Sequence, residues 1–161
     1  MKKRNRAEEN KRRRLGNRRV ADDDAFNAGV PTSPFGQRDS EGVCGRVYTV
    51  EIIESLARFA WQNLEKAGYL DRVRILHGDG SLGFQENAPY DRIIVTAAAP
   101  EILPGLLEQL RAGGILVIPV GGRSLLQQLF RVRKQESGRA LVENLGGVAF
   151  VPLIGEKGYS L

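Results

Sequence analysis

The pattern of hydrophobic and polar positions divides the chain near residue 43. Residues 1–42 contain charge runs, two prolines and scattered glycines, with no apolar run and no sustained period of 2 or 3.6 residues. Such a segment cannot bury enough apolar surface to offset the entropy of ordering. We therefore predict a disordered, low-complexity basic tail over residues 1–42, followed by one domain over residues 43–161.

Residues 43–161 alternate between strand-like and helix-like stretches. The strand-like runs are short and rich in Val and Ile: residues 46–52, 72–76, 92–97 and 115–120. Apolar side chains recur at helical spacing in residues 53–67 and 102–110, and Gly68 stands where a left-handed helix cap belongs. We expect the second helix to stop at Gly113-Gly114.

The last third of the chain has a different pattern. Residues 127–134 and 140–144, joined by a turn at 136–138, predict an antiparallel hairpin, and residues 148–153 predict a final strand. Strands and helices that alternate before such a hairpin indicate an α/β fold with a mainly parallel sheet. In such a sheet the ligand crevice lies beyond the carboxyl ends of the strands.

Acidic residues follow two of the predicted strands. Glu51 closes the first, where a carboxylate accepts hydrogen bonds from ribose hydroxyls, although a solvated acid is the plainer interpretation. Asp79 follows the second between Gly78 and Gly80, where it suits either an adenine amino group or an Asp-Gly turn. The small residues 96–100 leave room for a ligand or allow tight packing. These features describe an adenosine-sized crevice that suits nicotinamide and S-adenosylmethionine cofactors alike.

Other candidate chemistry is sparse. His77 is the single histidine, and we interpret it as a packing or hydrogen-bonding residue. Cys44 is the single cysteine, so an internal disulfide and a cysteine-rich metal site are excluded, and we predict no metal site. The longest apolar runs are too short to span a bilayer, and no secretory signal is evident, so we expect a cytoplasmic protein without a membrane partner.

The net charge of +5 is unevenly distributed. Residues 1–20 contain ten Lys or Arg and two Glu, a charge of +8, whereas the other 141 residues carry −3. A basic run of this kind attracts nucleic acid through counterion release, or is simply a solvated tail. A nucleic-acid-binding function through the tail is therefore one alternative, and the absence of interleaved aromatic residues favours the solvated tail.

Five motifs resemble those of one known family, both in their order along the chain and in their amino-acid sequence. They are GRVYTVE (residues 45–51), HGDG (77–80), APYDRIIVTAAAPEILP (88–104), LRAGGILVIPVG (110–121) and FVPLIG (150–155). Residues 43–161 thereby resemble the bacterial protein-L-isoaspartate O-methyltransferases. The resemblance implies a partial Rossmann-like S-adenosylmethionine methyltransferase sheet ending in an antiparallel hairpin. It also implies that Glu51 with Ile52, and Asp79 with Gly80, contact the ribose and adenine of S-adenosylmethionine, and that residues 151–154 form part of the site wall.

The function implied by the resemblance is repair of damaged proteins. Members of this family, usually monomers, methylate the α-carboxylate of an isoaspartyl residue, so isoaspartyl-containing proteins are the implied partners. The carboxylate is already ionised at neutral pH. The displacement at the sulfonium methyl group therefore needs alignment rather than a strong base, and we assign no catalytic residue.

The chain departs from the family before residue 45. It reads TSPFGQRDSEGVCGRVYTVE where the family has a strand and a glycine-rich loop resembling GxGxGY. The alternative interpretation is therefore an inactive truncated remnant or a frame-shifted gene product. We expect weak binding of S-adenosylmethionine, little activity and a marginally stable or aggregating chain. We also expect either a gap in the sheet or direct pairing of residues 47–50 with residues 93–96.

Overall fold

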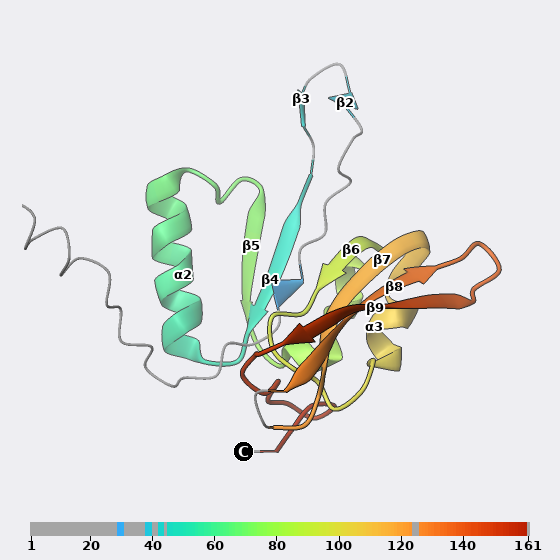
Figure 1. Cartoon of the computed structure of the whole chain (residues 1–161). Helices are drawn as coiled ribbons and strands as arrows, with labels where there is room; N and C mark the ends of the chain where they lie inside the picture. Colours follow the sequence, from blue (N-terminus) through green and yellow to red (C-terminus); the bar gives the residue numbers. More distant parts are fainter. Residues whose placement is uncertain (1–28, 31–37, 40–41, 44, 124–125, 161) are drawn as a thin grey trace, which may run out of the picture.

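The computed structural model describes residues 29–30, 38–39, 42–43, 45–123 and 126–160 (Figure 1). Of the predicted tail, only residues 29–30, 38–39 and 42 fall within these ranges, so the disorder of residues 1–42 stays a prediction. The rest of that segment and Cys44 lie outside the described residues.

The secondary-structure elements follow the predicted alternation of strands and helices. Before the first long helix come β1 (Gly29–Val30), β2 (Arg38–Asp39), β3 (Gly42–Val43) and β4 (Val47–Glu51). Next are α2 (Glu54–Ala67), β5 (Val73–His77), the 3-10 helices η1 (Gly80–Leu82) and η2 (Gln85–Asn87), and β6 (Tyr90–Ile94). The chain continues with α3 (Pro104–Glu108), β7 (Leu110–Gly121), β8 (Gln127–Lys134) and β9 (Ala140–Val148).

The main strands form two separate sheets (Figure 1). In the first, of order β1-β4-β5, β4 and β5 run parallel in a register that joins Val47 to Val73 and Glu51 to His77. The second has the order β6-β7-β8-β9, with β6 parallel to β7 and the remaining pairs antiparallel. Within the described ranges, strands β2 and β3 pair only with each other.

The predicted gap between β4 and β6 is therefore present within the described residues, and the alternative direct pairing does not form. Strand β1 comes from the segment that we predicted to be a tail. It pairs antiparallel with β4, joining Gly29 to Thr49 and Val30 to Tyr48.

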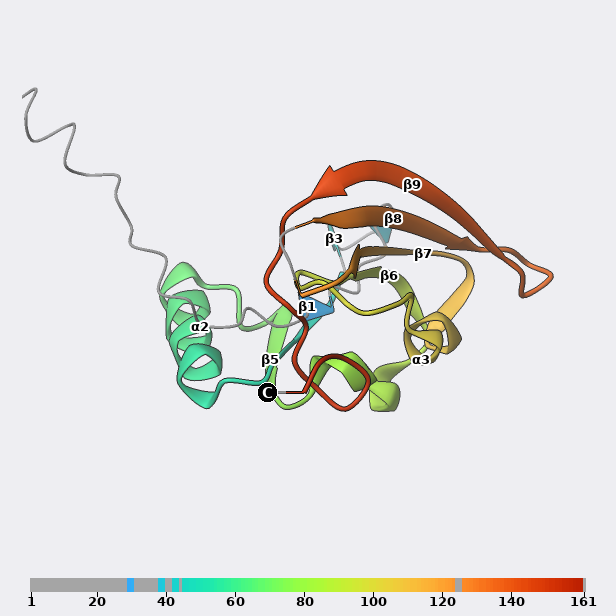
Figure 2. The same ribbon diagram turned by 60° about the horizontal axis from the view of Figure 1, so that its bottom comes forward.

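Helix α2 covers one face of β4 and β5, on the side away from the second sheet (Figure 2). Gly68 ends it with φ 74°, the left-handed conformation expected from the sequence, and its N–H group bonds to the Glu65 and Leu64 carbonyls. Ala57 is the buried residue of this helix. α2 is thus attached to the sheet by a narrow apolar stripe.

Several predicted boundaries shift in the second sheet. The strand predicted at residues 92–97 begins at Tyr90 and ends at Ile94, and the helix predicted at 102–110 is confined to Pro104–Glu108. β7 begins at Leu110 and runs through Gly113-Gly114, which we expected to lie outside a strand. The predicted last strand at residues 148–153 is wrong: β9 already ends at Val148, and residues 149–153 form an isolated bridge between Ala98 and Pro152 in place of a strand.

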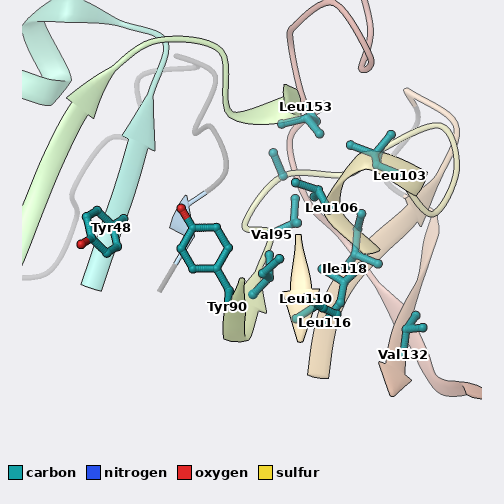
Figure 3. Close-up of a cluster of buried hydrophobic side chains, with 13 residues drawn as sticks. Tyr48, Tyr90, Val95, Leu103, Leu106, Leu110, Leu116, Ile118, Val132 and Leu153 are labelled. Atoms are coloured by element: carbon teal, nitrogen blue, oxygen red, sulfur yellow. The ribbon is translucent and has the colours of Figure 1, made fainter. Parts of the chain in front are cut away.

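The hydrophobic core belongs mainly to the second sheet, α3 and the C-terminal segment. Its buried residues, shown in Figure 3, are Tyr48, Tyr90, Ile93, Val95, Ala97, Ala99, Leu103, Leu106, Leu110, Leu116, Ile118, Val132 and Leu153. Tyr48 is the member contributed by the first sheet. Its ring centroid lies 5.6 Å from that of Phe84 and 6.2 Å from that of Tyr90, so an aromatic contact joins the two sheets.

Two polar side chains, Gln127 and Lys134, form hydrogen bonds that attach loops to this core. The Gln127 side chain donates to the Phe150 carbonyl at 3.2 Å and accepts from the Phe150 N–H at 2.8 Å. At the other end of β8, Lys134 Nζ donates to the carbonyls of Leu107, Glu108 and Leu110 at 2.8, 3.3 and 2.7 Å. That ammonium group satisfies carbonyls at the end of α3, where a cation is electrostatically favoured.

Candidate functional site

Glu51 lies at the carboxyl end of β4, as the sequence predicted. Its Oε1 accepts a hydrogen bond from the Ile53 N–H at 2.9 Å, which holds the partly buried side chain at the entrance to α2. The Glu51 carbonyl accepts from the Gly78 N–H at 3.0 Å, so the end of β4 is attached to the chain leaving β5. Ile52 is partly buried between these two positions.

Asp79 follows β5 at the same edge of the sheet and caps η1. Its Oδ1 accepts from the Ser81 N–H at 2.8 Å and from Ser81 Oγ at 2.7 Å. Its Oδ2 accepts from the Glu156 N–H at 2.6 Å. Gly80, the other residue predicted to touch adenine, is buried at the first position of η1. The Asp-turn interpretation is thus correct for the local conformation, while the carboxylate remains at the strand end.

The partners of Asp79 were not predicted from the sequence. Ser81 Oγ also accepts from the Lys157 N–H at 3.0 Å, so Ser81 and residues 155–157 enclose the carboxylate. An Asp with a Ser two residues later is a recognisable local capping signal. Nothing in the local sequence indicates that a loop 76 residues further on completes the cluster.

The small residues after β6 are packed rather than open. Ala97, Ala98 and Ala99 are fully buried. The Ala98 N–H donates to the Val151 carbonyl at 2.8 Å, and the Ala98 carbonyl accepts from the Leu153 N–H at 2.8 Å. Of the two interpretations, tight packing is the one observed, against the C-terminal segment.

Residues 151–154 lead directly into the loop that contacts Asp79. Leu153 and Ile154 are buried, and Tyr159 pairs with Ile154 and donates from its N–H to the Leu153 carbonyl at 2.7 Å. The Tyr159 hydroxyl also donates to the Gly121 carbonyl. The C-terminal segment therefore lies beside the predicted adenine-contacting residues, as the resemblance implied.

His77 is exposed, and its Nε2 lies 3.1 Å from the Ile52 carbonyl. This contact agrees with the hydrogen-bonding interpretation. In the described part of the chain, no three His, Cys, Asp or Glu side chains gather as metal ligands would. None of the described helices is both long and apolar enough to cross a membrane.

An open cavity of about 360 Å³ lies elsewhere, at the amino ends of β4 and β5. Among its lining residues are Arg46, Trp61 and Arg72. It is on the opposite end of the strands from Glu51 and Asp79. The position of a ligand in parallel sheets favours the carboxyl ends, so we assign the candidate site to Glu51 and Asp79 rather than to this cavity.

Two adjacent parallel strands joined by a helix, with acidic residues at or just beyond their carboxyl ends, have the arrangement of the Rossmann-like class of α/β folds. The family model described as protein-L-isoaspartate(D-aspartate) O-methyltransferase matches residues 39–158. The chain belongs to this family.

Similar proteins with known names agree with this assignment. Proteins named protein-L-isoaspartate O-methyltransferase match at 57% identity over 113 residues in Thermococcus onnurineus and at 54% over 120 residues in Pyrococcus horikoshii. These matches cover 70% and 74% of this chain, and 51% and 54% of the relatives. A third, from Methanosarcina mazei, is 52% identical over 134 residues, covering 83% of this chain and 51% of the relative. The chain thus spans about half the length of the relatives it matches.

Solved structures give the same fold. One protein-L-isoaspartate O-methyltransferase superposes with a TM-score of 0.64 at 29% identity, covering 71% of this chain and 36% of that protein. A second, described as a putative enzyme of this kind from Plasmodium falciparum in complex with S-adenosyl-L-homocysteine, has a TM-score of 0.58 at 25% identity. It covers 68% of this chain and 52% of that protein.

Proposed function

We propose that this chain carries the adenosine-binding part of a protein-L-isoaspartate O-methyltransferase. The observation that supports the proposal most directly is the position of Glu51 and Asp79 at the carboxyl ends of neighbouring parallel strands. Family membership supplies the reaction: methyl transfer from S-adenosylmethionine to an isoaspartyl carboxylate in damaged proteins.

The residues present suit the adenosine end of S-adenosylmethionine. Glu51 carries a carboxylate that accepts one backbone hydrogen bond at Oε1, leaving acceptor capacity for ribose hydroxyls. Asp79 and Gly80 stand beyond the next strand, where the adenine would lie. We assign Glu51 with Ile52 to the ribose, and Asp79 with Gly80 to the adenine. The buried segment 151–154 forms the adjoining wall.

When bound, S-adenosylmethionine supplies an electrophilic sulfonium methyl group. The contribution of this chain is to bind and orient the nucleoside, so that the methyl group and an ionised substrate carboxylate align. No proton has to be moved from such a carboxylate at neutral pH. The described residues therefore need to provide no general base, and we assign none.

We further propose that the partners are isoaspartyl-containing proteins in the cytoplasm and that this chain, unlike the monomeric members of the family, is prone to aggregate. Because the residues before Gly45 do not match the glycine-rich loop of the family, we expect weak donor binding and little methyl transfer. The nucleic-acid alternative rests on basic residues outside the described ranges. No described feature favours it over donor binding.

Calorimetric titration of the full chain with S-adenosyl-L-homocysteine tests donor binding. We expect saturable binding weaker than about 100 µM, corresponding to about −5.5 kcal/mol. Glu51→Ala should weaken it further by about tenfold, since it removes the ribose acceptor, whereas Glu65→Ala on the exposed surface of α2 should not. Low-micromolar affinity would contradict the expected weakness, and an affinity unchanged by Glu51→Ala would exclude Glu51 from the site.

Transfer of labelled methyl groups to an isoaspartyl peptide, with the matching aspartyl peptide as control, tests the reaction. A low but isoaspartate-dependent rate would support the proposed function. Equal labelling of the two peptides would contradict the proposed substrate. Binding without any transfer would support the alternative that the chain is an inactive remnant.

A further inference from the structure

One face of the second sheet is not covered by any of the described helices. Directly opposed residues on neighbouring strands share a face, and side chains alternate between the faces along each strand. Lys134 of β8 bonds to the carbonyls of Leu107 and Leu110, so it marks the face on which α3 lies. Val132, two residues earlier, is opposite Leu116 in the same core. The residues that alternate with these form the other face, while α2 packs on the first sheet.

This other face, which we call the open face, has an apolar centre flanked by basic side chains. Two rows of cross-strand neighbours on β6, β7 and β8 form it: Arg92, Ile115 and Arg133, then Ile94, Val117 and Arg131. Ile94 is 43% exposed, and Leu141 on the adjoining strand β9 is 54% exposed. Exposed apolar side chains rimmed by polar groups are typical of interaction surfaces.

The open face is also positively charged. Its rows carry three arginines and, on β9, the carboxylate of Glu143, which gives a net charge of +2. Glu143 accepts from Arg131 Nε and Nη2 at 3.1 and 2.5 Å. In the described part of the chain no carboxylate pairs with Arg92 or Arg133, and Arg92 donates to the neutral Asp91 carbonyl at 2.7 Å. These two guanidinium groups can therefore pair with an acidic partner.

The centre of the open face is lower than its rim. Ile115 and Val117 are partly buried, whereas Arg133 beside Ile115 is exposed. A protruding apolar strip fits such a surface better than a flat one does. Side chains at positions i, i+3, i+4 and i+7 of an amphipathic helix form a strip of this kind. A helix about 10 Å wide covers three strands that are about 4.8 Å apart, so it would cover β6, β7 and β8 together.

The charge of the open face restricts what can bind there. Residues 1–20 of this chain carry a charge of +8, so they would meet like charge on this face. A second copy of the chain would present the same arginines and would be repelled in the same way. A helix with acidic flanks matches the apolar centre and the basic rim at once.

We propose that the open face binds an acidic amphipathic helix of a partner protein. The apolar side chains of the helix contact Ile94, Ile115 and Val117, and its carboxylates pair with Arg92 and Arg133. The inference goes beyond the proposed donor binding, because it concerns a different part of the molecule.

Calorimetry on the full chain tests the inference with a helical peptide of about 18 residues that has Leu along one face and Glu elsewhere. A matched peptide with Lys in place of every Glu is the control. We expect the Glu peptide to bind with a Kd of about 100 µM and the Lys peptide at least about tenfold more weakly. Equal binding of the two peptides, or binding of neither at about 1 mM, would contradict the inference.

Substitutions on the open face show where the peptide binds. Arg133→Glu, at an exposed position, should weaken binding of the Glu peptide by about tenfold and strengthen binding of the Lys peptide by at least about threefold. Simple loss of folded structure would not strengthen the second. Ile94→Asn should weaken binding of the Glu peptide by about fivefold. Lys66→Glu, in the last turn of α2, makes the same charge change outside the open face and should leave both affinities unchanged.

Two other results would overturn the inference. If Arg133→Glu and Ile94→Asn leave the affinity for the Glu peptide unchanged, the peptide binds elsewhere, as it would on the basic residues 1–20. Vesicles of phosphatidylserine test a membrane as the alternative occupant, and we expect both substitutions to leave vesicle binding unchanged. Vesicle binding that falls with both substitutions would assign the open face to a lipid surface instead.

Discussion

Gln109 shows how a single buried side chain supports the loop between the site and the core. It is 4% exposed, accepts from the Phe84 N–H at 2.8 Å and donates to the Leu82 carbonyl at 2.8 Å. A buried amide that satisfies two backbone groups stabilises a loop chiefly by avoiding unpaired polar groups. The Phe84 carbonyl accepts from the Tyr90 hydroxyl, so a second side chain also hydrogen-bonds to this loop.

Replacing Gln109 with Ala should lower the free energy of unfolding by about 2–4 kcal/mol, since one buried donor and one buried acceptor lose their partners. Denaturant unfolding measures the change. Gln62→Ala, on the exposed face of α2, is the control and should change stability by less than about 0.5 kcal/mol. Equal effects of the two substitutions would show that the Gln109 bonds contribute nothing specific.

Tyr90 gives the fold a pH dependence in alkaline solution. Burial, with the nearby Tyr48 and Glu86, raises the pKa of Tyr90 from 10.0 to about 12. The unfolded chain therefore ionises first, so the stabilisation is complete below pH 10 and is lost as the pH rises towards 12. We expect the loss to be about 1–2 kcal/mol in the free energy of unfolding. Tyr90→Phe should remove this part of the pH dependence, whereas Tyr69→Phe, at an exposed position, should leave it unchanged.

Individual site residues differ in how far the sequence could predict them. The positions of Glu51 and Asp79 at the strand ends were predictable because residues at the end of a parallel strand lie at one edge of the sheet, whatever the rest of the fold does. Ser81 and Gly155 were not, because their role depends on a contact between chain segments 76 residues apart. Local patterns contain no information about which distant loop approaches a strand end.

Among the elements, α2 was predicted almost to the residue because its apolar spacing and its terminating glycine agree. The segment 148–153 was predicted as a strand because its apolar run is compatible with any buried extended chain. Pro152 lacks an N–H for a ladder, and the Val151 carbonyl and the Leu153 N–H on either side of it both bond to the single residue Ala98. The start of β6 and the passage of β7 through Gly113-Gly114 depend on a register shift between Tyr90 and Arg92 that no periodicity indicates.

Two glycines, one that ends α2 and one inside α3, should respond in opposite ways to substitution by Ala. Gly68 has φ 74°, with no atom near the position of an added Cβ, so Gly68→Ala should destabilise by about 1–2 kcal/mol through backbone strain alone. Gly105 lies inside α3, also with open space around its Cβ position, and has no positive φ. Gly105→Ala should therefore be neutral or stabilising by up to about 1 kcal/mol. Thermal melting of both variants checks the opposite signs.

At the scale of the whole molecule, the two sheets have unequal cores. Twelve of the thirteen buried residues in the main cluster come from residues 90–153, and Tyr48 alone comes from the first sheet. α2 contributes one buried residue to its own sheet, while Phe59 and Trp61 on it are 62% and 44% exposed. Few buried contacts mean a low free energy of local opening.

We therefore expect amide hydrogens of β4, β5 and α2 to exchange faster than those of β7 and β8 under native conditions. The difference should correspond to opening free energies lower by at least about 2 kcal/mol. Tyr48→Ala should widen the difference, since it removes the ring that packs between the sheets. Uniform protection across both sheets would show that they open as one cooperative unit.

The separation of the sheets also bears on solution behaviour. Among the described residues, β6 has no strand partner on one edge, and only the two-residue strand β1 covers the corresponding edge of β4. Backbone groups on such edges pair readily with other chains. We expect size-exclusion chromatography to show concentration-dependent association and melting to be broad. A monodisperse monomer with one sharp transition above about 50 °C, in the ordinary mesophile range, would contradict this expectation. It would mean that the gap between the sheets lowers the free energy of unfolding only slightly.

Lys134 has a consequence for how the second sheet finds its alignment. Side chains alternate between the faces of a strand, so a slip of β8 by one residue would turn this ammonium group to the opposite face. The Leu107, Glu108 and Leu110 carbonyls would then lose their shared donor at once. A misaligned hairpin is thus penalised at the far end of α3, well away from the strand pairing itself. The hydrogen bonds of Lys134 therefore favour the correct register of β8 over a register shifted by one residue.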